Sequence, residues 1–80
     1  MPRYRFNVHD RFGGAEDEEG LHLADREAAR RHAIAGARSL IAEDVLHGRL
    51  DLHGRIDVVD SRGRLLFSVS FGEAAGGAGS

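Results

Sequence analysis

The first candidate ligand-binding side chains are arginines on two predicted strands. Residues 3–9 and 55–60 alternate apolar and polar side chains, which is typical of a strand with one buried face. The polar residues then share the water-facing side of the sheet, and the binding residues that we predict there are Arg3, Arg5, His9, Arg55 and Arg64. Guanidinium groups bind phosphate and carboxylate, so this face could take nucleic acid, phosphate or an acidic peptide. The alternative is a solvated face covered by arginine stems.

Carboxylates and histidines form two further groups. Residues 16–19 are all acidic and could hold Ca²⁺, but they lack the alternating ligand pattern of a calcium loop. A solvated loop, or one that meets the arginine face of a second copy, fits better. Five histidines are present, with no HxH, HxxxH or HExxH pair. We therefore predict no metal ion and no cofactor.

Catalytic motifs are absent from the sequence. Ser39 and Ser61 lie outside any Gly-x-Ser-x-Gly elbow, and Gly13-Gly14 lacks the Lys-Ser/Thr of a phosphate-binding loop. A chain of 80 residues also offers little room for a desolvated cleft. We expect no enzyme activity.

The composition excludes several classes of protein. Eleven basic residues, all arginine, stand against thirteen acidic ones, for a net charge of -2. The absence of cysteine excludes disulfides and thiolate zinc sites. The longest apolar runs are far too short to cross a membrane, and residues 1–6 lack the apolar core of a secretory signal. We expect a cytoplasmic protein.

The longest predicted element is a helix that starts after Asp25, a good N-cap, and ends before Gly48. Its apolar stripe consists of Ala29, Ala33, Ala37, Leu40, Ile41 and Val45. Arg30 and Asp44 lie on the same stripe, and each either meets a polar partner elsewhere or extends its polar end to the water at the rim. Asp44 is close to the negative end of the helix dipole, which suggests a compensating arginine.

Strands are predicted before and after this helix in the sequence. Residues 3–9, 20–23, 55–60 and 65–71 form them, with a hairpin turn at 60–63. In the last strand the predicted inward side chains are Leu65, Phe67, Val69 and Phe71, with Leu66 facing outward. The fold class is therefore α+β, a small antiparallel sheet in β-β-α-β-β order with the helix on one face. Residues 1–71 form one domain, and 72–80 form a disordered Gly/Ala-rich tail.

The order of short motifs resembles a bacterial family of unknown function, domain of unknown function 6894. The matching residues are Pro2-Arg3-Tyr4, Phe6, Val8, Asp17-Glu18-Glu19-Gly20, Leu23, Asp25, Ala28-Ala29-Arg30 and the turn 60–64. Arg5 stands where the family usually has an aromatic residue, and Asn7 where it often has histidine. The resemblance implies no particular activity, cofactor or catalytic residue.

Two functional hypotheses remain, besides a weaker third one, a metal site formed by His47 with His53 or by His9 with His22. The first is a non-catalytic protein-interaction module that self-associates as a dimer, because an exposed final strand is prone to pair. The second is a small regulatory nucleic-acid or phosphate binder that uses the arginine face, whose affinity should fall steeply with salt.

Overall fold

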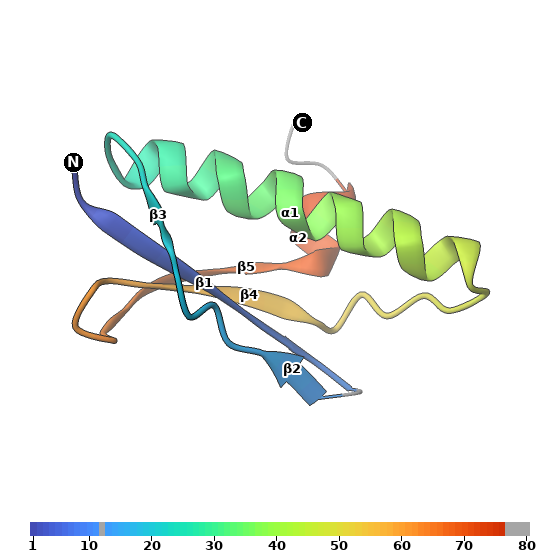
Figure 1. Cartoon of the computed structure of the whole chain (residues 1–80). Helices are drawn as coiled ribbons and strands as arrows, with labels where there is room; N and C mark the ends of the chain where they lie inside the picture. Colours follow the sequence, from blue (N-terminus) through green and yellow to red (C-terminus); the bar gives the residue numbers. More distant parts are fainter. Residues whose placement is uncertain (12, 77–80) are drawn as a thin grey trace.

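A computed structural model, which describes residues 1–11 and 13–76, has one antiparallel sheet with a long helix across one face (Figure 1). The strands follow the order β2-β1-β4-β5, and β3 also pairs with β1. The α+β prediction is confirmed. The elements are β1 (Arg3–Asp10), β2 (Gly13–Ala15), β3 (Leu21–His22), α1 (Arg26–Leu46), β4 (Arg55–Val59), β5 (Leu65–Ser70) and α2 (Phe71–Gly76).

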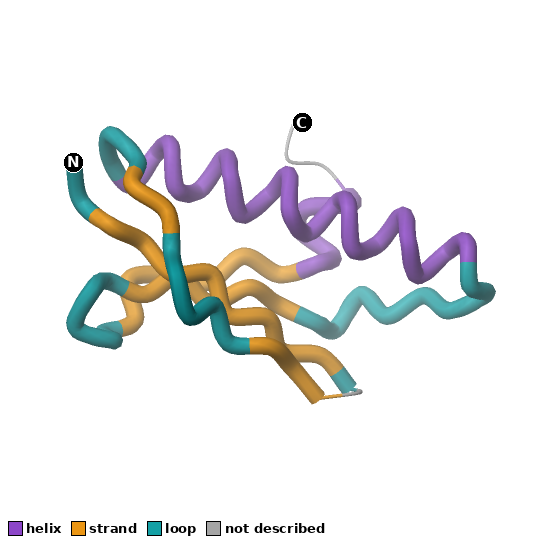
Figure 2. The backbone as a smooth tube through the Cα atoms, in the orientation of Figure 1, coloured by secondary structure: helices purple, strands orange, loops and turns teal. Residues whose placement is uncertain are grey.

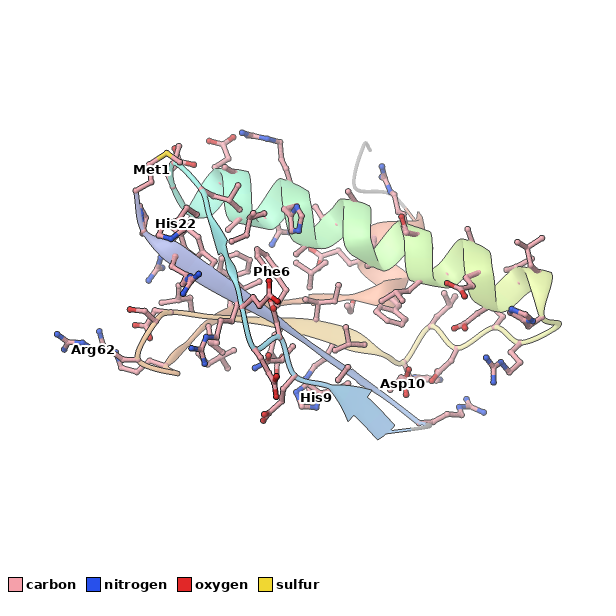
Figure 3. The ribbon with its side chains drawn as sticks, viewed as in Figure 1. Met1, Phe6, His9, Asp10, His22 and Arg62 are labelled. Carbon is pink, nitrogen blue, oxygen red and sulfur yellow. The ribbon has the colours of Figure 1, made fainter. Side chains whose placement is uncertain are left out.

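The register of β1 and β4 sorts their side chains onto two faces. Phe6 pairs with Val58, which is fully buried beneath α1. The neighbouring pair, Asn7 and Asp57, therefore points to the opposite face, because successive side chains of a strand alternate. Figure 3 shows Phe6 on the α1 side of the sheet and His9 on the far side. The core thus lies between the sheet and α1, and the polar residues share the outer face.

Helix α1 begins where the sequence predicts. The Asp25 carboxylate accepts the Ala28 N–H at 2.9 Å, and Gly48 has a left-handed φ of +73° just after the helix. Three small residues, Ala29, Ala33 and Ala37, are buried and let the helix approach the sheet closely.

The predicted stripe is wrong at its end. The last turns of α1 extend past the strands (Figure 2). Val45 is consequently 56% exposed.

A bulge near the hairpin changes which side chains of β5 face the core. Val58 pairs with Phe67 but Val59 pairs with Leu65, so β5 has one extra residue, Leu66. Leu66 packs against the core, whereas Leu65 is 60% exposed on the outer face. The predicted sides of these two leucines are therefore wrong.

Helix α2 extends the fold past the predicted end of the domain. Phe71 opens this helix instead of ending a strand, and the Ser70 hydroxyl accepts the Glu73 N–H at 3.0 Å. Ala74 is fully buried in the core. The expectation of a tail from Gly72 with nothing to bury is wrong for residues 72–76, while residues 77–80 lie outside the described part of the chain.

Candidate functional site

Asp57, in the middle of the outer face, gathers three polar side chains from three strands. Its carboxylate accepts a hydrogen bond from the Ser68 hydroxyl at 2.6 Å and one from the Arg55 Nε at 3.0 Å. The His9 Nε2 lies 3.3 Å from its other oxygen. We call these four residues the Asp57 cluster.

The cluster keeps its carboxylate ionised. Burial raises the pKa of Asp57, but the bonds from Ser68 and Arg55 and the charges of Arg55 and His9 outweigh burial. The net effect is a pKa below the usual 3.8. Asp57 therefore neutralises positive charge on this face at neutral pH.

The arrangement of the cluster does not activate a nucleophile. The Ser68 hydroxyl donates to the carboxylate and not to the imidazole, so His9 does not take its proton. Across residues 1–11 and 13–76, no three histidine or acidic side chains converge closely enough to hold a metal ion.

The four predicted binding arginines lie in four different environments. Arg55 belongs to the Asp57 cluster, and Arg64 forms an ion pair with Asp60 in the hairpin at 3.2 Å. Arg3 is exposed at the start of β1, opposite His22 of β3. Arg5 is partly buried, and its Nε is enclosed without a hydrogen-bond partner among the residues that the structure describes. The structure thus brings Arg5, His9 and Arg55 onto one face, although this face is largely charge-paired.

Asp60 stabilises the hairpin between β4 and β5, which ends at Arg64. Its carboxylate accepts the backbone N–H groups of Arg62 and Arg64, both at 2.9 Å. The bond from the Arg64 N–H is the main reason why the pKa of Asp60 is lowered; burial opposes it, and Arg62 and the Arg64 guanidinium add to the lowering.

Asp17 fills a gap along the outer edge of β1. This strand pairs with β2 only at residues 8–10 and with β3 only at residues 3–4. Between them, the Phe6 N–H donates to Asp17 Oδ2 at 3.2 Å. A carboxylate therefore replaces a backbone carbonyl at this point of the ladder.

The same side chain closes its own loop. Asp17 Oδ1 accepts the N–H groups of Glu19 and Gly20, and the Asp17 N–H donates to Asn7 Oδ1 at 2.9 Å. Gly20 has a φ of +73°, and a Cβ there would lie 2.8 Å from the Tyr4 carbonyl oxygen. The acidic run is thus anchored at Asp17 and is not a fully solvated loop.

The pKa of Asp17 is also lowered. Burial raises its pKa, but the three backbone N–H bonds, with the nearby Arg5 charge, lower it by more.

A depression of about 210 Å³ lies beside this loop, lined by Arg5, Asn7, Val59, Gly63 and residues 16–18.

The two edges of the sheet differ. Within the described ranges, no strand pairs with β5 on the side away from β4. The Phe71 N–H donates to the Gly54 carbonyl of the β4 side at 2.8 Å. Because backbone groups alternate along an antiparallel strand, the Ser68 and Ser70 N–H groups point to the open side.

The chain matches a family model over residues 3–72, and the family is described as Domain of unknown function (DUF6894). The chain belongs to this family. The match runs from β1 to the first turn of α2. Comparisons with curated proteins and with solved structures give no match. No helix in the described part of this DUF6894 domain has the length and apolar character to cross a membrane.

Sequence reasoning missed one buried charge of this DUF6894 domain. Asp51 is 3% exposed, accepts the His53 N–H at 2.9 Å and the Arg11 N–H at 3.3 Å, and pairs with the Arg11 guanidinium. The His53 bond is the main reason why its pKa is lowered; burial opposes it and Arg11 adds to it. Asp51 therefore ties the α1–β4 connector to the end of β1. An aspartate in a predicted connector gives no signal of such a role.

The two charged residues of the α1 stripe, Arg30 and Asp44, contact α2 and the α1–β4 connector. Arg30 forms an ion pair with Glu73 of α2, and the Arg38 Nε donates to the Ala74 carbonyl at 2.9 Å. Asp44 lies 3.9 Å from the Arg49 guanidinium. These contacts are structural.

Proposed function

We propose that this DUF6894 domain is a small, non-catalytic protein-interaction module that associates with a second copy of itself through the open edge of β5. The observation that carries this proposal is an unprotected strand: β5 has six residues, Leu65–Ser70, and none of them is charged or proline. Sheet edges that stay unpaired in solution are usually blocked by charges, proline or very short strands.

The opposite side of the sheet supports the proposal by contrast. There β1 is covered by β2 and β3, which have only three and two residues. The segment between them is acidic, and its Asp17 occupies the Phe6 N–H. That side presents no continuous ladder to a second chain, so β5 is the side available for pairing.

Antiparallel pairing of two β5 strands also brings no like charges together. In a symmetric pair each residue faces the same strand of the second copy, and β5 supplies only leucine, phenylalanine, valine and serine. Its open N–H and C=O groups would then form hydrogen bonds across the two-fold axis. Each bond would contribute about 1 kcal/mol to the free energy of association.

The nucleic-acid hypothesis has weaker support. Arg55 and Arg64, two of its five residues, are paired with Asp57 and Asp60. The acidic residues 16–18 lie beside Arg5 around the same depression. This pairing reduces the positive charge that a phosphate backbone would meet. We therefore favour self-association.

The test is the mass of the protein in solution at tens of micromolar, measured by light scattering or sedimentation. We expect the mass of two chains. Ser68→Pro removes an N–H from the open edge without removing a β4–β5 bond, so its dissociation constant should rise about 30-fold for the two reciprocal bonds lost.

Ser68→Ala is the matched control, because both variants lose the hydroxyl bond to Asp57 and only proline loses the N–H. Circular dichroism must show that both variants fold. A wild-type mass of one chain would overturn the proposal, and so would equal dissociation constants for the two variants.

A further inference from the structure

Ser68 is the one residue of β5 whose backbone is both open and regular. Its N–H points away from β4, by the alternation that the Phe71 to Gly54 bond sets. Two other residues of β5 have N–H groups on the open side. Leu66 is displaced by the bulge, and Ser70 is the last residue of the strand, where its hydroxyl accepts the Glu73 N–H at the start of α2. Pairing through β5 therefore has a preferred centre.

We infer that two copies pair antiparallel with Ser68 of one facing Ser68 of the other on the two-fold axis. This inference rests on the proposed self-association and adds the register of the interface. The Ser68 N–H of each copy donates to the Ser68 carbonyl of the second copy, and Ser70 of each lies opposite Leu66 of the other. The two sheets become one continuous sheet across the axis.

The central side chains of this register, at positions 67 to 69, match on both faces. On the inner face, Phe67 comes to lie beside Val69 of the second copy, an aromatic and β-branched pair that stabilises sheets. Phe67 is only partly buried within one chain, although it packs against the core. The second copy covers its remaining exposed surface.

On the outer face, the two Ser68 hydroxyls meet at the axis while each donates to its own Asp57. A row of polar side chains, from Asn7 through Asp57 to Ser68, then continues into the same row of the second copy. Neither side chain of the central pair carries a charge, so nothing at the axis repels.

The closing experiment uses the absence of cysteine from the chain. Facing residues of a hydrogen-bonded antiparallel pair have Cα atoms about 5.5 Å apart, within disulfide range. We expect Ser68→Cys to form a linked dimer under mild oxidation, at least about tenfold faster than Ser70→Cys. In the inferred register the two residues at position 70 are offset by four positions, roughly 13 Å along the strand.

The outcomes separate the register from the proposed function. Faster linking at position 68 supports the register, whereas faster or equal linking at position 70 overturns it even when the wild type has the mass of two chains. A wild-type mass of one chain overturns the proposed function and the register together.

Hydrogen exchange on the wild-type protein keeps the inference testable if a cysteine variant does not fold. The Ser68 amide should lose protection when the protein is diluted below its dissociation constant. The Val69 amide, which faces β4, should keep its protection. Concentration-independent exchange at Ser68 would overturn the register.

Discussion

Replacing Asp17 by alanine should destabilise the protein more than a surface substitution does. The carboxylate accepts three backbone N–H groups, from Phe6, Glu19 and Gly20, at 3.0 to 3.2 Å. Alanine leaves all three without this acceptor. The Phe6 donor matters most, because it lies in the middle of β1, between the short pairings with β2 and β3.

The magnitude follows from these bonds. A hydrogen bond to a charged acceptor contributes about 2 kcal/mol when the donor is shielded from water, and we assign that value to Phe6. The two loop donors can bind water instead, so about 0.5 kcal/mol each is reasonable. The sum is about 3 kcal/mol, or roughly 12–24 °C in melting temperature for a domain of this size.

Thermal and urea unfolding followed by circular dichroism measure this change. All variants must be compared at one protein concentration, because the proposed self-association would make the stability depend on concentration. Glu18→Ala is the control, since this neighbouring carboxylate is exposed and forms no side-chain bond within the described residues. A melting temperature of Asp17→Ala within about 4 °C of Glu18→Ala would refute the reasoning.

Two further predictions concern acid and the second helix. The pKa values of Asp17, Asp51, Asp57 and Asp60 lie below the usual 3.8 in the folded protein, so the unfolded chain takes up protons first as the pH falls. Stability should be constant above about pH 5 and should decrease below pH 4; a urea midpoint that does not fall between pH 5 and pH 3 would contradict this. Ala74→Glu places a charge in the core and should cost about 3 kcal/mol or more, whereas Ala75→Glu, at an exposed position, should cost less than about 0.5 kcal/mol. Equal urea midpoints for the two variants would show that α2 does not pack as described.

The long helix and the main strands could be predicted because their signals are local. Asp25, the three buried alanines and Gly48 define α1 within one stretch of chain, and the alternation of residues 3–9 defines β1. The outer position of Arg5, His9 and Arg55 follows from the same alternation.

Features set by distant contacts could not be predicted. The bulge at Leu66 depends on how β5 pairs with β4, and the burial of Ala74 depends on the underside of α1. The sequence does not distinguish Asp17 from its three acidic neighbours, because its role depends on the contact with β1. The charge pairing of Arg55 and Arg64 likewise arises only when the hairpin has formed, which is why the alternation alone predicts a locally basic face whereas the folded face is largely charge-paired.

The unequal protection of the two sides of the sheet would limit the size of an assembly of the proposed kind. If β5 of one chain pairs with β5 of another, the open strand edge found within the described residues of each chain is used. The outermost strands of the pair are then the two- and three-residue segments separated by the Asp17 loop. Growth would stop at a stoichiometry of two, and the backbone groups that could seed fibres would be consumed in a closed, symmetric contact.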